Sequence, residues 1–160
     1  MGSRHLPLST GTALTTSDRR LLYGLRQNVD LERGLLGVPA GYVNPDEDTA
    51  NGRLNIVSSL KRELEEEVGT LDQDVDKVQC LGLVGKEQTY IAFATELVIS
   101  FGDILQRHPR EREFATIESA DTDRDSLRTF IELNHKQMTK HSLANILLYG
   151  MWCYGEEWLD

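Results

Sequence analysis

The sequence predicts a single-domain α/β protein in which helices pack on a mixed sheet. Three observations predict this class. A polar turn separates two short apolar runs near the amino end, a helical spacing of apolar residues begins near residue 55, and strand-like runs follow between residues 78 and 99. With 160 residues the chain can bury one core without disulfides or a structural metal, so we expect one domain over residues 1–160. We interpret residues 1–5 as a disordered start or a cloning remnant.

The first part of the chain is expected to form a hairpin followed by a loop. Residues 10–15 and 21–26 have strand-like composition and flank the polar turn residues 16–18. Residues 35–45 are rich in Gly and Pro, which indicates a strand end that continues into a loop. This part of the protein should therefore be sheet.

The second half of the chain is expected to supply more strands and two helices. Residues 78–84 and 89–99 are typical of buried strands, the second through its β-branched and aromatic side chains. Residues 114–117 indicate another strand, and residues 125–133 and 142–154 have helical spacing.

Composition and charge limit the classes of partner that the protein is expected to bind. The chain is 39% apolar and 27% charged, close to ordinary soluble proteins, and its longest apolar stretch is too short to span a membrane. No basic segment followed by an apolar run begins the chain, so the expected location is the cytoplasm. A formal net charge of -9 argues against binding polynucleotide, whereas a bound cation would let an acidic pocket hold a small anion. No G-x-S-x-G or G-x-x-x-x-G-K-[ST] motif occurs.

Cysteines and aromatic residues in the second half are interpreted as core. Cys80 and Cys153 are far apart and have no further partners for a disulfide framework or a zinc site. The aromatic residues near the carboxyl end are also expected in the core, with a homodimer surface as the alternative: Tyr149, Trp152, Tyr154 and Trp158.

A helix with adjacent acidic and apolar faces is predicted from about Asn55, and Gly69 is placed to end it. Its apolar stripe has three- and four-residue spacing: Val57, Leu60, Leu64 and Val68. At about 100° per residue, Glu63, Glu66 and Glu67 fall within about 100° of one another and roughly 110° from the stripe. Glu65 points elsewhere, toward solvent. The three carboxylates would repel one another on a bare helix, and Mg2+ or Mn2+ would remove that cost.

Taken alone, the acidic run is more often a solvated helix face. The wider pattern favours a functional site. Gly41, Glu47 and the segment Arg62-Glu63-Leu64-x-Glu66-Glu67-x-Gly69 resemble the signature of the Nudix hydrolase family, G-x5-E-x7-R-E-U-x-E-E-x-G-U, where U is aliphatic. The resemblance implies an α/β/α sandwich with a mixed sheet between helices, and an enzyme that hydrolyses diphosphate linkages with a divalent metal.

The sequence departs from this signature at two places. Fourteen residues separate Glu47 from Arg62 where the family has seven, and Thr70 replaces the closing aliphatic residue. We place the extra seven residues in the loop 48–54, because Asn51-Gly52 is a turn dipeptide that would weaken a helix. The alternative, an insertion within the helix, would lengthen it by about 10 Å. The longer gap argues against the pairing of Glu47 with Arg62 that the family pattern implies.

The resemblance implies roles for individual residues. Glu63, Glu66 and Glu67 would bind the metal or polarise water, and Arg62 would orient them. Gly41 would shape the loop ahead of the helix and border the substrate. Family members often recruit one more acid from a later loop, for which Glu111 and Glu113 are the candidates, and a solvated loop is the alternative for both. Arg26, which closes the second strand of the hairpin, is a candidate substrate contact.

We therefore expect a magnesium-dependent hydrolase of a nucleoside diphosphate linked to another moiety. The alternative is a non-catalytic domain of the same fold that binds a nucleotide or a protein partner. A third hypothesis, an acidic structural domain, predicts no stabilisation by metal.

Overall fold

The computed structural model describes residues 7–27, 34–86 and 88–160, so the interpretation of residues 1–5 lies outside the described residues. Within these residues a seven-stranded sheet follows the order β3-β2-β1-β8-β7, with β4 paired to β1 and β9 paired to β2. Strands β1 and β8 are parallel, whereas the other pairs are antiparallel. The sheet strands are β1 Leu8–Thr15, β2 Arg20–Arg26, β3 Leu36–Gly37, β4 Ala40–Tyr42, β7 Val75–Val84, β8 Thr89–Leu97 and β9 Phe114–Asp121.

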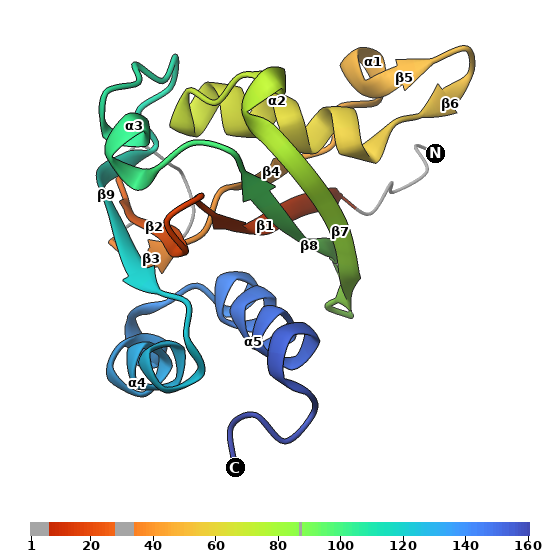
Figure 1. Ribbon diagram of the computed structural model, residues 1–160. Helices are drawn as coiled ribbons and strands as arrows, with labels where there is room; N and C mark the ends of the chain where they lie inside the picture. The colour runs from red at the N-terminus through yellow and green to blue at the C-terminus, as the bar shows by residue number, and fades with distance from the viewer. Residues whose placement is uncertain (1–6, 28–33, 87) are drawn as a thin grey trace.

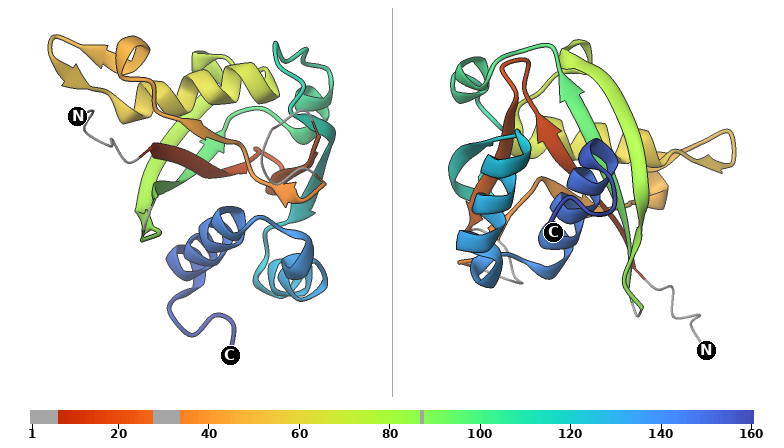
Figure 2. Two further views of the ribbon diagram at one scale, coloured as in Figure 1. Left: turned by 180° about the vertical axis from the view of Figure 1, so that it is seen from behind. Right: turned by 60° about the horizontal axis from the view of Figure 1, so that its bottom comes forward.

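Helices cover both faces of this mixed sheet (Figure 1). Helix α2 lies on one face, and α4 and α5 lie on the other (Figure 2). The helices are α1 Pro45–Asp48, α2 Ile56–Val68, α3 Phe101–Leu105, α4 Arg124–Asn134 and α5 Lys140–Tyr154, with 3-10 turns at Asp72–Asp74 and His135–Gln137. The predicted α/β/α sandwich with a mixed sheet is confirmed. No helix of the described residues is long and apolar enough to cross a membrane.

Side chains of the central strands point alternately to the two faces of the sheet and contribute to two hydrophobic cores. Leu14 and Leu22 pack under α2, while their neighbours Ala13 and Leu21 pack under α4 and α5. Successive strand residues point to opposite faces, so each strand contributes to both layers.

The predicted hairpin of β1 and β2 forms, but the two strands pair only beside their turn. Their direct register partner pair is Thr15 and Leu21. Farther from the turn, β4 pairs with β1 from Ser9 to Gly11, and β2 pairs with β9 along its length. This brings the residues around Gly41 into the sheet beneath α2.

Helix α2 begins and ends where the apolar stripe predicts. Asn55 caps its first turn, and Gly69 ends it with a left-handed φ of 81°. Residues 49–54 form a small hairpin instead of a longer helix, with β5 Thr49–Ala50 and β6 Arg53–Leu54. Asn51 and Gly52 both have positive φ, as a tight two-residue turn requires. Of the stripe, Val57 is the exception, because it is 38% exposed.

Three expectations about the second half are wrong in part. Strand β7 forms but is mostly exposed, because it lies at the end of the sheet order. Cys80, in that strand, and Cys153, on the outer side of α5, are both exposed, so neither is a core residue. Of the four aromatic residues, Tyr149 and Trp158 are buried, while Trp152 and Tyr154 are 43% and 40% exposed. Helices α1 and α3 had no periodic signal, since each has five residues or fewer.

Candidate active site

The acidic face of α2 is turned toward strand β4 and the segment before β9. Leu60, Leu64 and Val68 have no exposed surface and fix the helix on the sheet. This orientation buries Glu67 at 2% exposure, while the Glu65 side chain is 50% exposed, as helical phase predicts. The acidic and apolar faces are thus adjacent.

Strand β4 approaches this face so closely that a side chain at Gly41 would displace the Glu63 carboxyl. A Cβ atom there would lie 2.1 Å from Cδ of Glu63. Next to it, the backbone N–H of Ala40 donates to Oε2 of Glu67 at 3.2 Å. Gly41 is needed here for close approach to a carboxylate.

Glu67 faces a second carboxyl group, that of Glu113, just before β9. Its other oxygen, Oε1, is buried and accepts no hydrogen bond from an N–H or hydroxyl group of the described residues. Burial raises the pKa of Glu67 well above its ordinary value, and a hydrogen bond with the Glu113 carboxyl raises that pKa further. Two carboxyl groups this close require a shared proton or a cation.

Glu63 and Glu66 share this environment. Burial raises the pKa of Glu63 to about 8, and the charge of Glu66 adds to the shift. Burial also raises the pKa of Glu66, followed by the charge of Glu111. Glutamates whose charged forms are disfavoured without a cation are typical of functional sites.

Arg62 lies at the edge of this cluster with several carboxylates around it. Its Nη1 forms an ion pair with Glu47, so the expectation that the long gap separates these residues is wrong. The helix α1 and the hairpin after it absorb the extra residues and return the chain beside Glu47. Nη2 of Arg62 lies 3.1 Å from Asp48 Oδ2 and 3.6 Å from Glu63 Oε1.

The segment before β9 runs along the carboxyl-terminal half of α2. The backbone N–H of Glu111 donates to Glu66 O at 2.9 Å, and Nη2 of Arg110 lies 3.7 Å from Glu66 Oε1. Both candidate extra acids therefore lie near the glutamates. Only Glu113 reaches the Glu67 carboxyl, whereas Glu111 is exposed.

A cavity of about 260 Å³ adjoins the cluster on the far side of β4 and includes Ala40 and Gly41. Arg26 lines it, and the buried Nε of this side chain has no hydrogen-bond partner among the described residues. His141 stacks on Tyr90 with ring centroids 4.8 Å apart. The cavity thus combines a cation with flat aromatic surface, directly beside the carboxylates.

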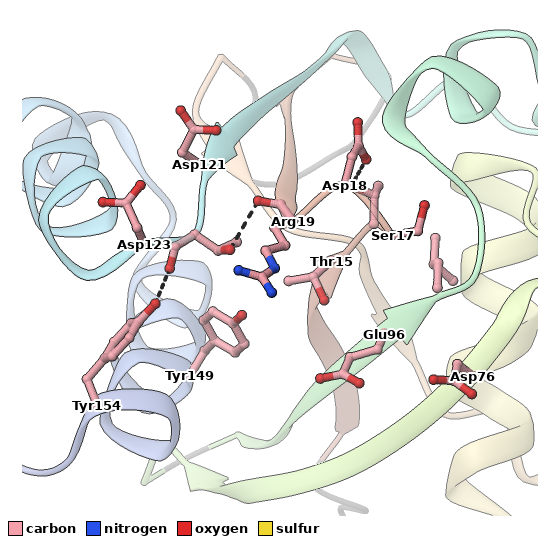
Figure 3. Close-up of a pocket in the computed structure, with 13 residues that line it drawn as sticks. Thr15, Ser17, Asp18, Arg19, Asp76, Glu96, Asp121, Asp123, Tyr149 and Tyr154 are labelled. Carbon is pink, nitrogen blue, oxygen red and sulfur yellow. Dashed lines mark hydrogen bonds between the residues drawn. The ribbon is translucent and has the colours of Figure 1, made fainter.

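A larger cavity, of about 730 Å³, lies at the other ends of β1 and β8. Five carboxylates line it: Asp18, Asp76, Glu96, Asp121 and Asp123. Figure 3 shows the Arg19 side chain pointing in among them. The pKa of Asp18 is lowered by hydrogen bonds from the Thr16 hydroxyl and the Phe101 N–H. None of the residues that line this cavity belongs to β4 or α2.

The glutamate cluster fits a hard divalent cation. The unpartnered Oε1 of Glu67 and the close carboxyl pair are the oxygen chemistry that Mg2+ selects. Within 7–27, 34–86 and 88–160, no three His, Cys, Asp or Glu side chains converge as a complete ligand set. Mg2+ usually takes only one or two carboxylates and completes its shell with water and substrate phosphates. The residues present suit that mode.

The structure brings the predicted glutamates, Arg62, Gly41 and Glu113 close together, and it adds three neighbouring residues that the sequence did not mark. Asp48 follows Glu47 directly, and its place beside the family's glutamate was the signal available. Tyr42 and His141 line the small cavity, but neither has a spacing that marks it. Their place beside one cavity depends on how β4 and α5 pack around the start of β1 and β8, which no local pattern shows.

Comparison with solved structures defines the class of fold. A MutT protein from Methanosarcina mazei Go1 superposes with a TM-score of 0.65 at 15% identity, covering 92% of this chain and 95% of that one. A Nudix hydrolase from Nitrosomonas europaea gives 0.61 at 16% identity, covering 91% and 88%. The Nudix domain of Shewanella oneidensis NrtR, solved with ADP ribose, gives 0.61 at 13% identity, covering 92% and 88%.

The chain therefore has the Nudix fold over nearly its whole length. No protein-family model matches the sequence, and no curated protein is similar to it in sequence. The fold, more than sequence similarity, connects this chain to these solved structures.

Proposed function

We propose that this protein is a divalent-metal-dependent hydrolase that cleaves the diphosphate linkage of a nucleoside diphosphate joined to another moiety. The observation that carries the proposal is the buried Glu67 carboxyl, with an unpartnered oxygen beside Glu113 and Glu63. A soluble domain does not keep such a group uncompensated without a use for it.

In this proposal Glu63, Glu66 and Glu67 hold Mg2+ or Mn2+. A bound ion of this kind offsets charge on the phosphate oxygens and lowers the pKa of water. Gly41 leaves room for the Glu63 carboxylate, and Arg62 keeps it oriented. Glu113 is placed to take a proton, because its carboxyl lies beside that of Glu67.

The small cavity would take the part of the substrate beyond the diphosphate. Arg26 can bind a further phosphate or a carbonyl oxygen, and the His141 ring, held by stacking on the buried Tyr90, offers a surface for a planar group. Support for a nucleotide-like ligand comes from the similar NrtR domain, which was solved with ADP ribose. A soluble homodimer acting in the cytoplasm completes the proposal.

Hydrolysis of ADP-ribose and related nucleoside diphosphate compounds with Mg2+ or Mn2+ tests this function. Glu66→Gln and Glu67→Gln should each lower kcat on the order of 10²- to 10³-fold, as when charge stabilisation is removed from a transition state. Glu65→Gln is the matched control, since this side chain is on the same helix but exposed. Parental rates in the Glu66 and Glu67 variants would refute the assignment.

A second function, ligand binding without turnover, is favoured by one observation. No three candidate side chains of the described residues already converge as an ion site. Calorimetric binding of ADP-ribose without product formation under saturating Mg2+ and Mn2+ would support it over hydrolysis.

A further inference from the structure

Asp48, the last residue of α1, has an almost completely buried carboxylate. Its side chain is 3% exposed, whereas that of Glu47 is 60% exposed. Oδ2 of Asp48 accepts hydrogen bonds from the Asn44 N–H at 2.8 Å and from Arg62 Nη2 at 3.1 Å. Asp48 therefore joins the start of α1 to the middle of α2.

The backbone of Asp48 holds the beginning of α2 as well. Its carbonyl accepts the Asn55 N–H at 2.6 Å, and Asn55 Oδ1 in turn caps α2 by accepting the Ser58 N–H. The β5–β6 hairpin begins directly after Asp48 and ends directly before Asn55. It projects beyond the amino end of α2 (Figure 1). One residue thus fixes the base of the hairpin, the helix cap and the arginine.

Few other contacts fix the Arg62 guanidinium. Its Nε is buried and has no hydrogen-bond partner among the described residues, and the Tyr42 carbonyl is 3.5 Å from Nη2. The Glu47 pair lies mostly in water, where screening and side-chain entropy weaken an ion pair. The buried Asp48 pair lies in a medium of lower dielectric and is further held by a backbone N–H.

We propose that Asp48 is a positioning residue for the hydrolysis, with Glu47 as a secondary partner. Asp48 holds Arg62 where its Nη2 lies 3.6 Å from Glu63 Oε1, while the backbone at Gly41 lies against the Glu63 carboxyl. A displaced guanidinium would leave that carboxylate free to rotate. The inference rests on the proposed function, because it assigns Asp48 a part in that reaction.

Asp74 offers a matched control on the same protein. Its side chain is 5% exposed, accepts the Leu71 N–H at 2.7 Å and pairs with Arg107 at 3.1 Å. Asp48→Asn and Asp74→Asn therefore remove the same charge from the same kind of buried pair. Both should lower Tm.

Only Asp48→Asn should lower kcat, by about 10- to 100-fold as for other supporting partners of catalytic ligands. The substrate KM should stay near that of the parent protein, and Glu47→Gln should have a smaller effect on kcat. In an Arg62→Ala background Asp48→Asn should cost little more, since residues that act through one another are not additive.

A second measurement reports on Arg62 without relying on turnover. Side-chain ¹⁵N NMR should show a fixed Arg62 guanidinium in the parent protein and in Asp74→Asn, and a mobile one in Asp48→Asn. Equal kcat for the two Asn variants, or an unchanged Arg62 signal in Asp48→Asn, overturns the positioning role while leaving the proposed function intact. A parent protein with no metal-dependent turnover overturns the proposed function itself, and with it any catalytic part for Asp48, whatever the NMR shows.

Discussion

Two groups of carboxylates lie near opposite ends of the parallel strands β1 and β8. They differ in how many hydrogen-bond donors surround them. Around the large cavity, Asp18 accepts a hydroxyl and a backbone N–H, and Asp123 accepts the Ser126 N–H at the start of α4. These hydrogen bonds lower the pKa of both residues. Around α2, by contrast, burial raises the pKa of all three glutamates.

The difference separates carboxylates that already have hydrogen-bond donors from carboxylates that are buried with few donors. Asp18 and Asp123 already accept hydrogen bonds, so their negative charges are stabilised without a ligand, although the cavity beside them is large. Glu63 and Glu67 are removed from water without enough donors, and a cation would restore the balance.

Substitution of Gly41 tests the crowded end most strongly. Gly41→Ala places a methyl group on the flexible end of Glu63, so we expect kcat to fall on the order of 10²-fold, as for a misplacement of about 1 Å. Stability should change little, because Glu63 can move aside. Gly102→Ala is the control, since its Cβ would meet only Ser100 Oγ at 3.7 Å. Full activity in Gly41→Ala would contradict the packing described.

Arg26 tests whether the small cavity binds substrate. Arg26→Gln should raise the substrate KM about tenfold or more, the range for a lost hydrogen bond to a charged group, and leave kcat nearly unchanged. Steady-state kinetics measure both. Arg128→Gln, which removes an exposed arginine of α4, should change neither. A fall in kcat at constant KM would instead place Arg26 in the chemical step.

The stability of the metal-free protein should depend on pH with a defined sign. Folding raises the pKa of Glu63 from its ordinary 4.5 to about 8, so the folded state binds this proton more tightly. The resulting stability is present below about pH 4.5 and is lost as the pH rises toward 8. Thermal unfolding in a chelator should therefore show Tm falling across this window.

Glu63→Gln should flatten that fall, because its amide does not titrate. Saturating Mg2+ should raise Tm again at the higher pH. An ion at 100 times its Kd adds about 2.7 kcal/mol to the free energy of unfolding. A metal-free Tm that rises over the same window would show that the Glu63 carboxylate is already stabilised by the protein.

The sequence predicts those parts of the molecule that depend on local periodicity. Helix α2, its cap at Gly69 and the separation of Glu65 from the other glutamates follow from phase alone. Strand β7 was expected to be buried because its composition is apolar, but exposure depends on the order of strands in the sheet. Cys80 is exposed for the same reason, because it lies in β7, whereas Cys153 is exposed at the carboxyl-terminal end of α5.

The contacts of Arg62 show the same limit within the site. A count of residues between Glu47 and Arg62 suggested separation, yet α1 and the β5–β6 hairpin form a closed excursion whose ends meet at Asp48 and Asn55. The hairpin therefore lengthens the chain between Glu47 and Arg62 without increasing the distance between their side chains. Tyr42 and His141 likewise lie at one cavity only because the tertiary fold brings β4 and α5 to it.

Calorimetric titration with Mn2+ tests the central contrast most directly. The parent protein should bind the ion saturably, Glu67→Gln should lose that binding, and the double variant Asp76→Asn with Glu96→Gln, at the large cavity, should bind as the parent does. Mn2+ binding that survives in Glu67→Gln and disappears in the large-cavity variant would contradict the account, because the ion would then prefer the carboxylates at the other end of the sheet.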